Sequence, residues 1–423
     1  MEDFMKTVGI IAEYNPFHGG HAYHIQEAKR LSGADFVVVI LNGDFMQRGE
    51  PAMTDKYTRT RQALEGGADL VFELPVRFGI SSAGDFALGG ILALEALGFV
   101  DAVCFGSEVG ELPPLLEAAA VLQDEPDAFR QQLTHSLRQG LSFPAARAHA
   151  LSATTRLDAA LLKEPNNILG IEYCCALRKL SSSIKPLTIS RKGQAYHDEQ
   201  ETDEALFPSA TSLRKKIACE GTQPYLCLND FSSAIGYALL ATETLDSIKD
   251  ITPELADRII RFLPDYTDAE TFVAQCRNPS LTTGRIRRCL LQCLFGLHNT
   301  DPAMPYLRLL GISKKRREDP TLPRTTAGRS CSAHQEISDN SKKRREDPTL
   351  SDEKKEASSL LSRRENTSCP ILSRLAVDCK NLNPQVKALL QQDLFAADLY
   401  RQTWCRKYNV SLPNEYQHSP IVL

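Results

Sequence analysis

In the first 220 residues of the chain, short apolar runs alternate with segments whose apolar residues recur at helical spacing. The predicted strands are five of these runs, at residues 8–12, 36–41, 70–73, 102–105 and 186–190. The predicted helices between them cover residues 22–31, 56–65 and 82–97, and a longer helical interval precedes the last strand. Regular alternation of this kind favours a parallel sheet with helices on both faces, so the predicted fold class is α/β.

The turn between the first predicted strand and the first predicted helix carries two histidines around two glycines, in the order His18, Gly19, Gly20 and His21. Backbone N–H groups at a helix N-terminus are unpaired and the helix dipole is positive there, so such a turn favours an anion. Glycine lets a phosphate approach the main chain, and an imidazole on each side can stabilise charge on the bridging oxygens of a triphosphate. The turn therefore predicts an ATP site for attack at the α-phosphate.

Two alternative interpretations use the same residues. The histidines could belong to a surface turn with local hydrogen bonds, or they could bind a metal together with His24. No cysteine or carboxylate lies at ligand spacing beside them, and we therefore predict no metal site.

Two further loops follow predicted strands and should reach the same edge of the sheet. An Asn-Gly-Asp sequence at residues 42–44 follows the second strand, and a Phe-Gly-Ser-Glu sequence at residues 105–108 follows the fourth. Ligands of open α/β sheets bind at the carboxyl ends of the strands. We therefore expect these loops and the histidine turn to converge on one site.

The composition agrees with a soluble enzyme. A chain of 423 residues, 24% charged and 42% hydrophobic, can form two or three domains with sizeable cores. No apolar run approaches about 18 residues, the N-terminus lacks a signal-peptide pattern, and the twelve cysteines are scattered. We expect a cytoplasmic protein without a membrane segment. The net charge of −4 gives no global basic field, so any nucleic-acid contact must rely on a local patch.

The region from residue 223 to residue 310 is predicted to be helical, with helices at 230–240, 252–262, 268–276 and 283–297. Arg285, Arg287 and Arg288 lie in the first turns of the last of these helices and are predicted to contact an RNA backbone. A solvated charged face is the alternative. A further amphipathic helix is predicted at residues 385–404.

Between these helical segments lies an internal duplication. The sequence SKKRREDPTL occurs at residues 313–322 and again at residues 341–350. The stretch around it is rich in Ser, Lys, Arg and Glu, and it cannot bury enough apolar surface to offset the entropy of ordering. Residues 313–368 are therefore interpreted as a disordered low-complexity insertion.

The histidine turn resembles the HxGH signature of the HIGH-type nucleotidyltransferase superfamily. The longer run Glu13-Tyr14-Asn15-Pro16-Phe17-His18 is similar to one branch, the bacterial tRNA(Met) cytidine acetate ligases. The resemblance implies a Rossmann-like catalytic domain over residues 1–222. It also implies a mainly α-helical C-terminal domain over residues 223–312 and 369–423, which would contact tRNA.

The same resemblance implies which residues form the site. His18 and His21 would be catalytic, and a segment at residues 207–214 is similar to the second phosphate motif of the superfamily, although its serine and threonine could simply cap a helix. Either Asn166 or Asn167 would contact ATP, and the sequence does not decide between them. The full set of implied ATP-binding residues is Ile11, Ala12, Glu13, Tyr14, Asn15, Pro16, Phe17, His18, Gly19, Gly20, His21, His24, Gly106, Asn166, Asn167, Arg191, Ser209, Thr211 and Arg214.

The activity implied by the resemblance is an ATP-dependent ligation that uses ATP with Mg²⁺. Acetate would be activated as acetyl-adenylate, and the acetyl group would pass to N4 of the wobble cytidine (C34) of elongator tRNA(Met). Two alternatives remain open at this point: a nucleotidyltransferase that joins a nucleotide to a small phosphate ester in cofactor biosynthesis, and a non-enzymatic RNA adaptor that binds a nucleotide. The intact His18, His21 and Arg214 count against a decayed site.

Overall fold

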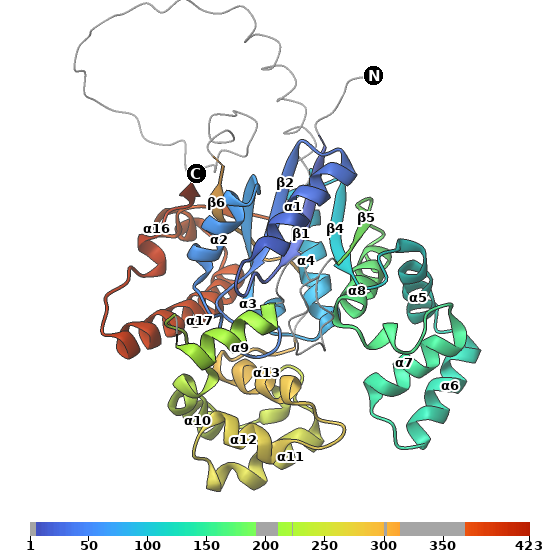
Figure 1. Cartoon of the computed structure of the whole chain (residues 1–423). Helices are drawn as coiled ribbons and strands as arrows, with labels where there is room; N and C mark the ends of the chain where they lie inside the picture. Colours follow the sequence, from blue (N-terminus) through green and yellow to red (C-terminus); the bar gives the residue numbers. More distant parts are fainter. Residues whose placement is uncertain (1–5, 192–209, 222, 300–302, 314–368) are drawn as a thin grey trace, which may run out of the picture.

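The protein is built around one central sheet whose strands carry the candidate site at their carboxyl ends (Figure 1). The computed structural model describes residues 6–191, 210–221, 223–299, 303–313 and 369–423. The order of the strands is β5-β4-β1-β2-β3-β6-β7, and β8 pairs with β6. Their bounds are β1 Thr7–Ala12, β2 Phe36–Asn42, β3 Leu70–Leu74, β4 Ala102–Ser107, β5 Lys185–Ser190, β6 Leu307–Ile312, β7 Ile371–Leu372 and β8 Ile421–Val422.

The first five strands are parallel, and side chains on alternate residues pack into different cores. In β2, Val37 and Val39 contribute to one core, while Val38 and Ile40 contribute to the other. All four side chains are fully buried, as expected for a parallel sheet covered on both faces. The predicted α/β class is confirmed.

Two pairs of helices cover the two faces of the sheet. Helices α1 and α2 contribute Ile25, Ala28, Ala63 and Leu64 to one core, and α4 and α8 line the other. The helices of this half are α1 Gly19–Ser32, α2 Lys56–Glu65, α3 Val76–Gly79, α4 Ala83–Leu97, α5 Leu112–Asp124, α6 Asp127–Arg138, α7 Phe143–Thr154, α8 Pro165–Lys179 and α9 Ala210–Glu220.

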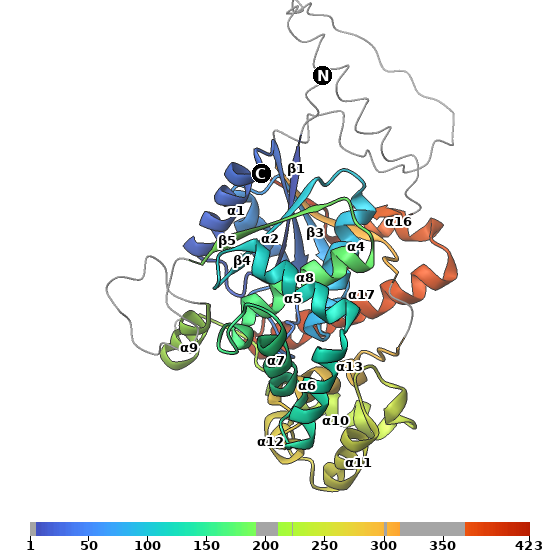
Figure 2. The same ribbon diagram turned by 90° about the vertical axis from the view of Figure 1, so that its right-hand side faces the viewer.

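A separate layer of helices lies below the carboxyl ends of the strands in Figures 1 and 2. Its members are α10 Ser232–Ala241, α11 Pro253–Phe262, α12 Ala269–Cys276 and α13 Thr283–Leu294. The long helix α17 (Pro384–Tyr408) and the short α16 (Leu375–Asp378) lie beside the sheet. The core of the layer also takes in Phe45 and Met46 from the loop after β2, and Tyr400 from α17. The helical layer is therefore packed directly on a loop of the candidate site.

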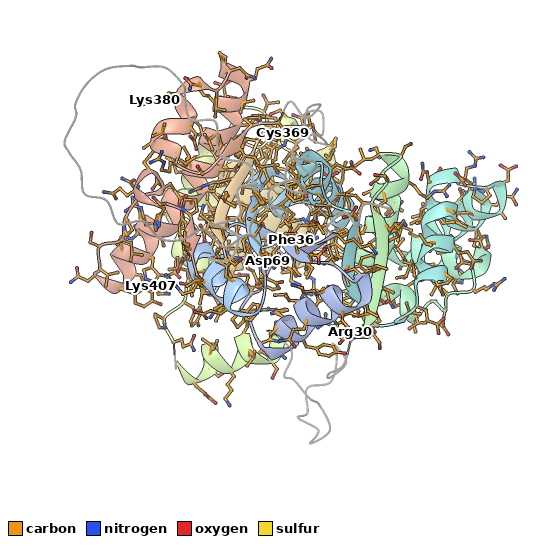
Figure 3. All side chains as sticks on the ribbon, turned by 90° about the horizontal axis from the view of Figure 1, so that it is seen from above. Arg30, Phe36, Asp69, Cys369, Lys380 and Lys407 are labelled. Atoms are coloured by element: carbon orange, nitrogen blue, oxygen red, sulfur yellow. The ribbon has the colours of Figure 1, made fainter. Side chains whose placement is uncertain are left out.

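Figure 3 looks down on the amino ends of the strands, which lie opposite the candidate site. Phe36 begins β2 there, and Asp69 precedes β3. The Asp69 side chain accepts a hydrogen bond from the Val37 N–H at 2.9 Å, so its polar groups serve the sheet itself.

The structure differs from the sequence-based division at the C-terminal end. Strand β6 was included in the helical region, but it pairs antiparallel with β3 and extends the catalytic sheet. Strands β7 and β8 pair in turn with β6. The sheet is thus mixed at this edge, and the chain returns to it after forming the helical layer. The proposed insertion at residues 313–368 lies outside the described residues except for Ser313, whose N–H donates to the Asp69 carbonyl at 2.9 Å.

Within the described part of the chain, no helix is both long enough and apolar enough to cross a membrane.

Candidate active site

The turn between β1 and α1 is built around His18, which is the N-cap of α1. Its backbone is extended, with φ −149° and ψ 172°, and its Nδ1 accepts a hydrogen bond from the Gly20 N–H at 3.1 Å. In return, the His18 N–H donates to Nδ1 of His21 at 3.3 Å, which makes a reciprocal capping box from two histidines. The two rings stack with their centroids 3.8 Å apart. Histidine therefore takes here the capping role that Ser, Thr, Asp and Asn usually fill.

These hydrogen bonds fix the tautomer of both rings. A backbone N–H can only donate, so each Nδ1 is an acceptor and each neutral ring carries its hydrogen on Nε2. Burial, and then the charge of Arg191, lower the pKa of His18 to about 4. Burial also holds the pKa of His21 well below its usual range, helped by the neighbouring His18 and His24. Near neutral pH both rings are uncharged Nε2–H donors.

Two histidine nitrogens of the turn and of α1 have no hydrogen-bond partner among the described residues. Nε2 of His18 and Nε2 of His24 are buried without a hydrogen bond. Burial, followed by Arg191, lowers the pKa of His24 to about 4, against the effect of a hydrogen bond with the Cys104 backbone. Buried polar atoms without partners are rare in native proteins, and here they cluster at a helix N-terminus. Such a cluster is suited to the oxygens of a bound anion.

The five residues before His18 are held by several parts of the chain. Tyr14 lies in the left-handed region at φ 51°, is buried, and packs on Phe17 and His21 with ring centroids 5.0 and 4.8 Å away. The Asn15 side chain accepts from the Met53 N–H at 2.8 Å, and the Asn15–Pro16 peptide is cis.

The structure brings Arg214 of the segment predicted to be a second phosphate motif to the histidine turn. Arg214 in α9 donates to the Asn15 carbonyl at 2.8 Å and to Oγ1 of Thr211 at 3.1 Å. Arg214 therefore lies against the backbone that leads into the histidine turn. Ser209, which the sequence placed in the same motif, lies outside the described residues.

Gly106 and Arg191 lie close together at the carboxyl ends of β4 and β5. Arg191 follows β5 directly, and its N–H donates to the Ser107 carbonyl at 3.2 Å. A Cβ on Gly106 would come within 3.2 Å of Cγ of Arg191. The absence of a side chain at Gly106 thus gives Arg191 room beside the carboxyl end of β4, where its charge acts on the three histidines.

The two asparagines in the first turn of α8 differ in their surroundings. Asn167 is fully buried; its Oδ1 accepts from the Val109 N–H and its Nδ2 donates to the Leu161 carbonyl. Asn166 is half-buried and binds the carboxylate of Glu108 in the loop after β4. Both polar atoms of the Asn167 side chain are thus engaged by backbone groups, so Asn166 is the better candidate to contact a ligand. Its assignment stays a prediction.

The other residues assigned to ATP binding lie along the same path of the chain. Ile11 and Ala12 end β1, Glu13 to Phe17 form the turn, and Gly19, Gly20, His21 and His24 belong to the first turns of α1.

The three arginines assigned to RNA make contacts within the protein. Arg287 binds the carboxylates of Glu50 and Glu270, the latter at 2.7 Å. Arg285 donates to the Asp250 carbonyl at 3.3 Å, and Arg288 donates to the Gln47 carbonyl at 3.4 Å. Arg287 and Arg288 thus attach α13 to the loop after β2, and none of the three is fully exposed. Their contact with RNA stays a prediction.

A group of buried charges on α2 was not among the residues predicted from the sequence. Lys56 and Arg59 are both fully buried, and Lys56 contacts Glu73 at 2.7 Å and Glu415 at 3.0 Å. Arg308 of β6 binds the same two carboxylates. The signal was present in the helix periodicity, because Lys56 and Arg59 lie on the same face as the buried Ala63 and Leu64.

Among the described residues, no group of three or more His, Cys, Asp or Glu side chains is arranged to hold a metal ion.

A parallel sheet with a histidine-capped helix at the carboxyl end of its first strand is the architecture of a HIGH nucleotidyl transferase, and residues 5–358 match that family. The tRNA(Met) cytidine acetate ligase of Halothermothrix orenii is 38% identical over 351 residues, covering 74% of this chain and 83% of that protein. The ligase of the same name from Acetivibrio thermocellus is 33% identical and covers 94% of both chains. The chain belongs to the tRNA(Met) cytidine acetate ligase family.

Solved structures agree with this fold. Crystal structures of Thermotoga maritima TmcAL in apo form I and with bound alpha-thio ATP match this chain with TM-scores of 0.79 and 0.77. Sequence identity is 25% and 24%, and each match covers 99% of this chain and 100% of the other.

Proposed function

We propose that this chain is an ATP-dependent ligase that acetylates the wobble cytidine (C34) of elongator tRNA(Met). In the first step the acetate carboxylate attacks the α-phosphorus of ATP and pyrophosphate leaves, which gives acetyl-adenylate. In the second step N4 of the cytidine attacks the acetyl carbonyl, loses a proton and releases AMP. The product is N4-acetylcytidine.

The observation that carries this proposal is the pair of neutral histidines at the N-terminus of α1. Each presents an Nε2–H donor, and that of His18 has no partner in the part of the chain that the structure describes. In adenylate formation negative charge develops on the leaving pyrophosphate, and fixed donors directed at that charge lower the barrier. Acetate is already ionised near neutral pH, so the site needs no general base for this step. Histidines with lowered pKa suit this task because they donate without gaining or losing a proton.

The two arginines of the site, Arg214 and Arg191, would position the substrates. Arg214 offers a permanently charged fork for phosphate oxygens, and Arg191 supplies a second charge beside the histidines. We propose that ATP enters as its Mg²⁺ complex, with the ion held by the phosphates. Acetate then binds in line with the bond to pyrophosphate.

The tRNA is the partner named by the relatives, and this name favours ligation over transfer of a nucleotide to a phosphate ester. We propose that the helical layer contributes to tRNA binding, with Arg285, Arg287 and Arg288 as candidate contacts. Their bonds to Glu50, Glu270 and backbone carbonyls would have to be shared with or exchanged for RNA phosphates. An enzyme that acts on tRNA would work in the cytoplasm.

The direct test follows the acetyl group. The protein is incubated with ATP and radiolabelled acetate, with and without bulk tRNA, and label on RNA is measured beside acetate-dependent exchange of pyrophosphate into ATP. Exchange without RNA and transfer of label to RNA are the expected results. Exchange with a small phosphate ester but not with acetate would select the nucleotidyltransferase alternative.

A further inference from the structure

We propose that Arg59 is a positioning residue of the active site, which holds the carboxyl ends of β1 and β2 in the geometry that adenylate formation requires. The inference rests on the proposed function. It assigns a role to a side chain that the sequence analysis did not single out.

Arg59 lies in α2 and is fully buried, and its guanidinium is directed at main-chain oxygens. Nη1 donates to the carbonyls of Glu13 and Asn42, each at 2.8 Å, and Nη2 donates to the carbonyl of Gly43. Nε donates to the carbonyl of Thr54 at 2.9 Å. One side chain thus binds four carbonyls from the β1 turn and from both ends of the loop between β2 and α2.

Two of these carbonyls, those of Glu13 and Asn42, lie just beyond the ladder between β1 and β2. The ladder between β1 and β2 ends at the pair Ala12 and Leu41, so Glu13 and Asn42 are the first residues beyond it. Buried carbonyls at such a place need another donor, and the planar fork of arginine can supply several donors at once. Because Glu13 lies five residues before His18, Arg59 fixes the path by which the chain enters the histidine turn.

Arg59 differs from the buried ion pairs nearby because its hydrogen-bond acceptors are main-chain carbonyls and not carboxylates. Its nearest carboxylate, that of Asp44, lies 3.7 Å from Nη2, beyond hydrogen-bonding distance. Arg308 is buried to a similar degree but binds the carboxylates of Glu73 and Glu415 and the hydroxyl of Tyr57. Both arginines stabilise the fold, but of the two only Arg59 holds the strand ends that carry the site.

This contrast supplies a matched experiment with Arg59→Lys and Arg308→Lys. Each change keeps the buried positive charge and removes the fork. Acetate-dependent pyrophosphate exchange is measured at saturating and limiting ATP, together with the thermal unfolding midpoint of each protein. Hydrogen–deuterium exchange of the peptide containing residues 13–21 reports the order of the turn directly.

We expect both variants to unfold at lower temperature, while kcat for exchange changes differently. Arg59→Lys should lower kcat roughly 10- to 100-fold, as for a small misplacement of reacting groups, with KM for ATP changed less than about threefold. Amide exchange in the turn should become faster in this variant. Arg308→Lys should keep kcat within about twofold and leave the turn protected.

Equal kcat values for the two variants would overturn the inference. Failure of Arg59→Lys alone to fold would also overturn it, because Arg59 would then be required for the fold rather than for the geometry of the site. Absence of acetate-dependent exchange in the wild-type protein would instead refute the proposed function, so the two failures are distinguishable.

Discussion

At Gly49 the loop after β2 packs directly on α13 of the helical layer, and replacing this residue with alanine tests that contact. Its φ is +77°, and a Cβ there would lie 2.5 Å from the Arg288 backbone nitrogen and 2.6 Å from Cβ of Arg287. A change of side-chain rotamer cannot relieve these clashes, because the atoms belong to the backbone and to a Cβ. The loop would have to move away from α13.

The left-handed backbone alone costs a residue with a Cβ about 1–2 kcal/mol, and overpacking adds about 1–3 kcal/mol. We therefore expect Gly49→Ala to lower the free energy of unfolding by about 2–5 kcal/mol. Gly296, just after α13, is the matched control because its φ is +60° and a Cβ there would meet nothing within 4 Å. Gly296→Ala should lower the free energy of unfolding by only about 1–2 kcal/mol.

The assay is urea unfolding of the wild-type protein and of the two variants. The midpoint and the dependence of the unfolding free energy on urea concentration are compared, since an unchanged slope shows that only stability has changed. Pyrophosphate exchange by Gly49→Ala should also fall, because the Gln47 N–H in the same loop binds the Glu13 carboxylate at 2.6 Å. Equal destabilisation by the two substitutions would refute the close packing of the loop on α13.

Three further predictions concern the site and its partners. His21→Ala should slow acetate-dependent pyrophosphate exchange about 10²- to 10³-fold while changing ATP affinity far less, and wild-type exchange in this variant would remove His21 from the mechanism. The pKa of His24 in the folded protein, about 4, lies below the usual value of 6.5, so the unfolded chain binds its proton first. The free energy of unfolding should therefore fall as the pH drops from about 6.5 to about 4, less steeply in His24→Gln, and parallel curves for the two proteins would contradict the burial of this ring. Replacing Arg285, Arg287 and Arg288 together with alanine should weaken tRNA binding and flatten its dependence on salt, whereas lower stability with an unchanged salt slope would limit these arginines to holding α13 in place.

Local patterns in the sequence predicted the elements that position the site. The predicted helix at residues 56–65 matches α2 in full, because its periodicity is clear and Asp55 caps its first turn. The first helix begins at Gly19, three residues before the predicted start, because the glycines of the turn hide its first residues from an apolar pattern. The prediction of an α/β catalytic sheet needed only these local signals.

Contacts between distant parts of the chain could not be predicted in this way. An isolated apolar run at Leu307–Ile312 carries no sign that its partner is β3, more than 230 residues earlier. Likewise, three arginines at the start of a helix fit either an RNA contact, as predicted, or a solvated face. Only the fold shows that Glu50 and Glu270 flank Arg287. The role of Arg59 was hidden for a related reason, since its acceptors are carbonyls and main-chain atoms leave no trace in a sequence.

The late return of the chain to β3 affects how the protein can be made and divided. During synthesis the nucleotide-binding half emerges first, but one edge of its sheet stays without a partner until β6 has followed the whole helical layer out of the ribosome. A fragment ending at residue 222 would keep the histidine turn but expose the backbone of β3. It would also leave Glu73 without Arg308, and Lys56 without Glu415. Exposed edges of this kind recruit other chains. The segment that completes the catalytic sheet thus lies far from it in sequence, and the two halves are better expressed together than apart.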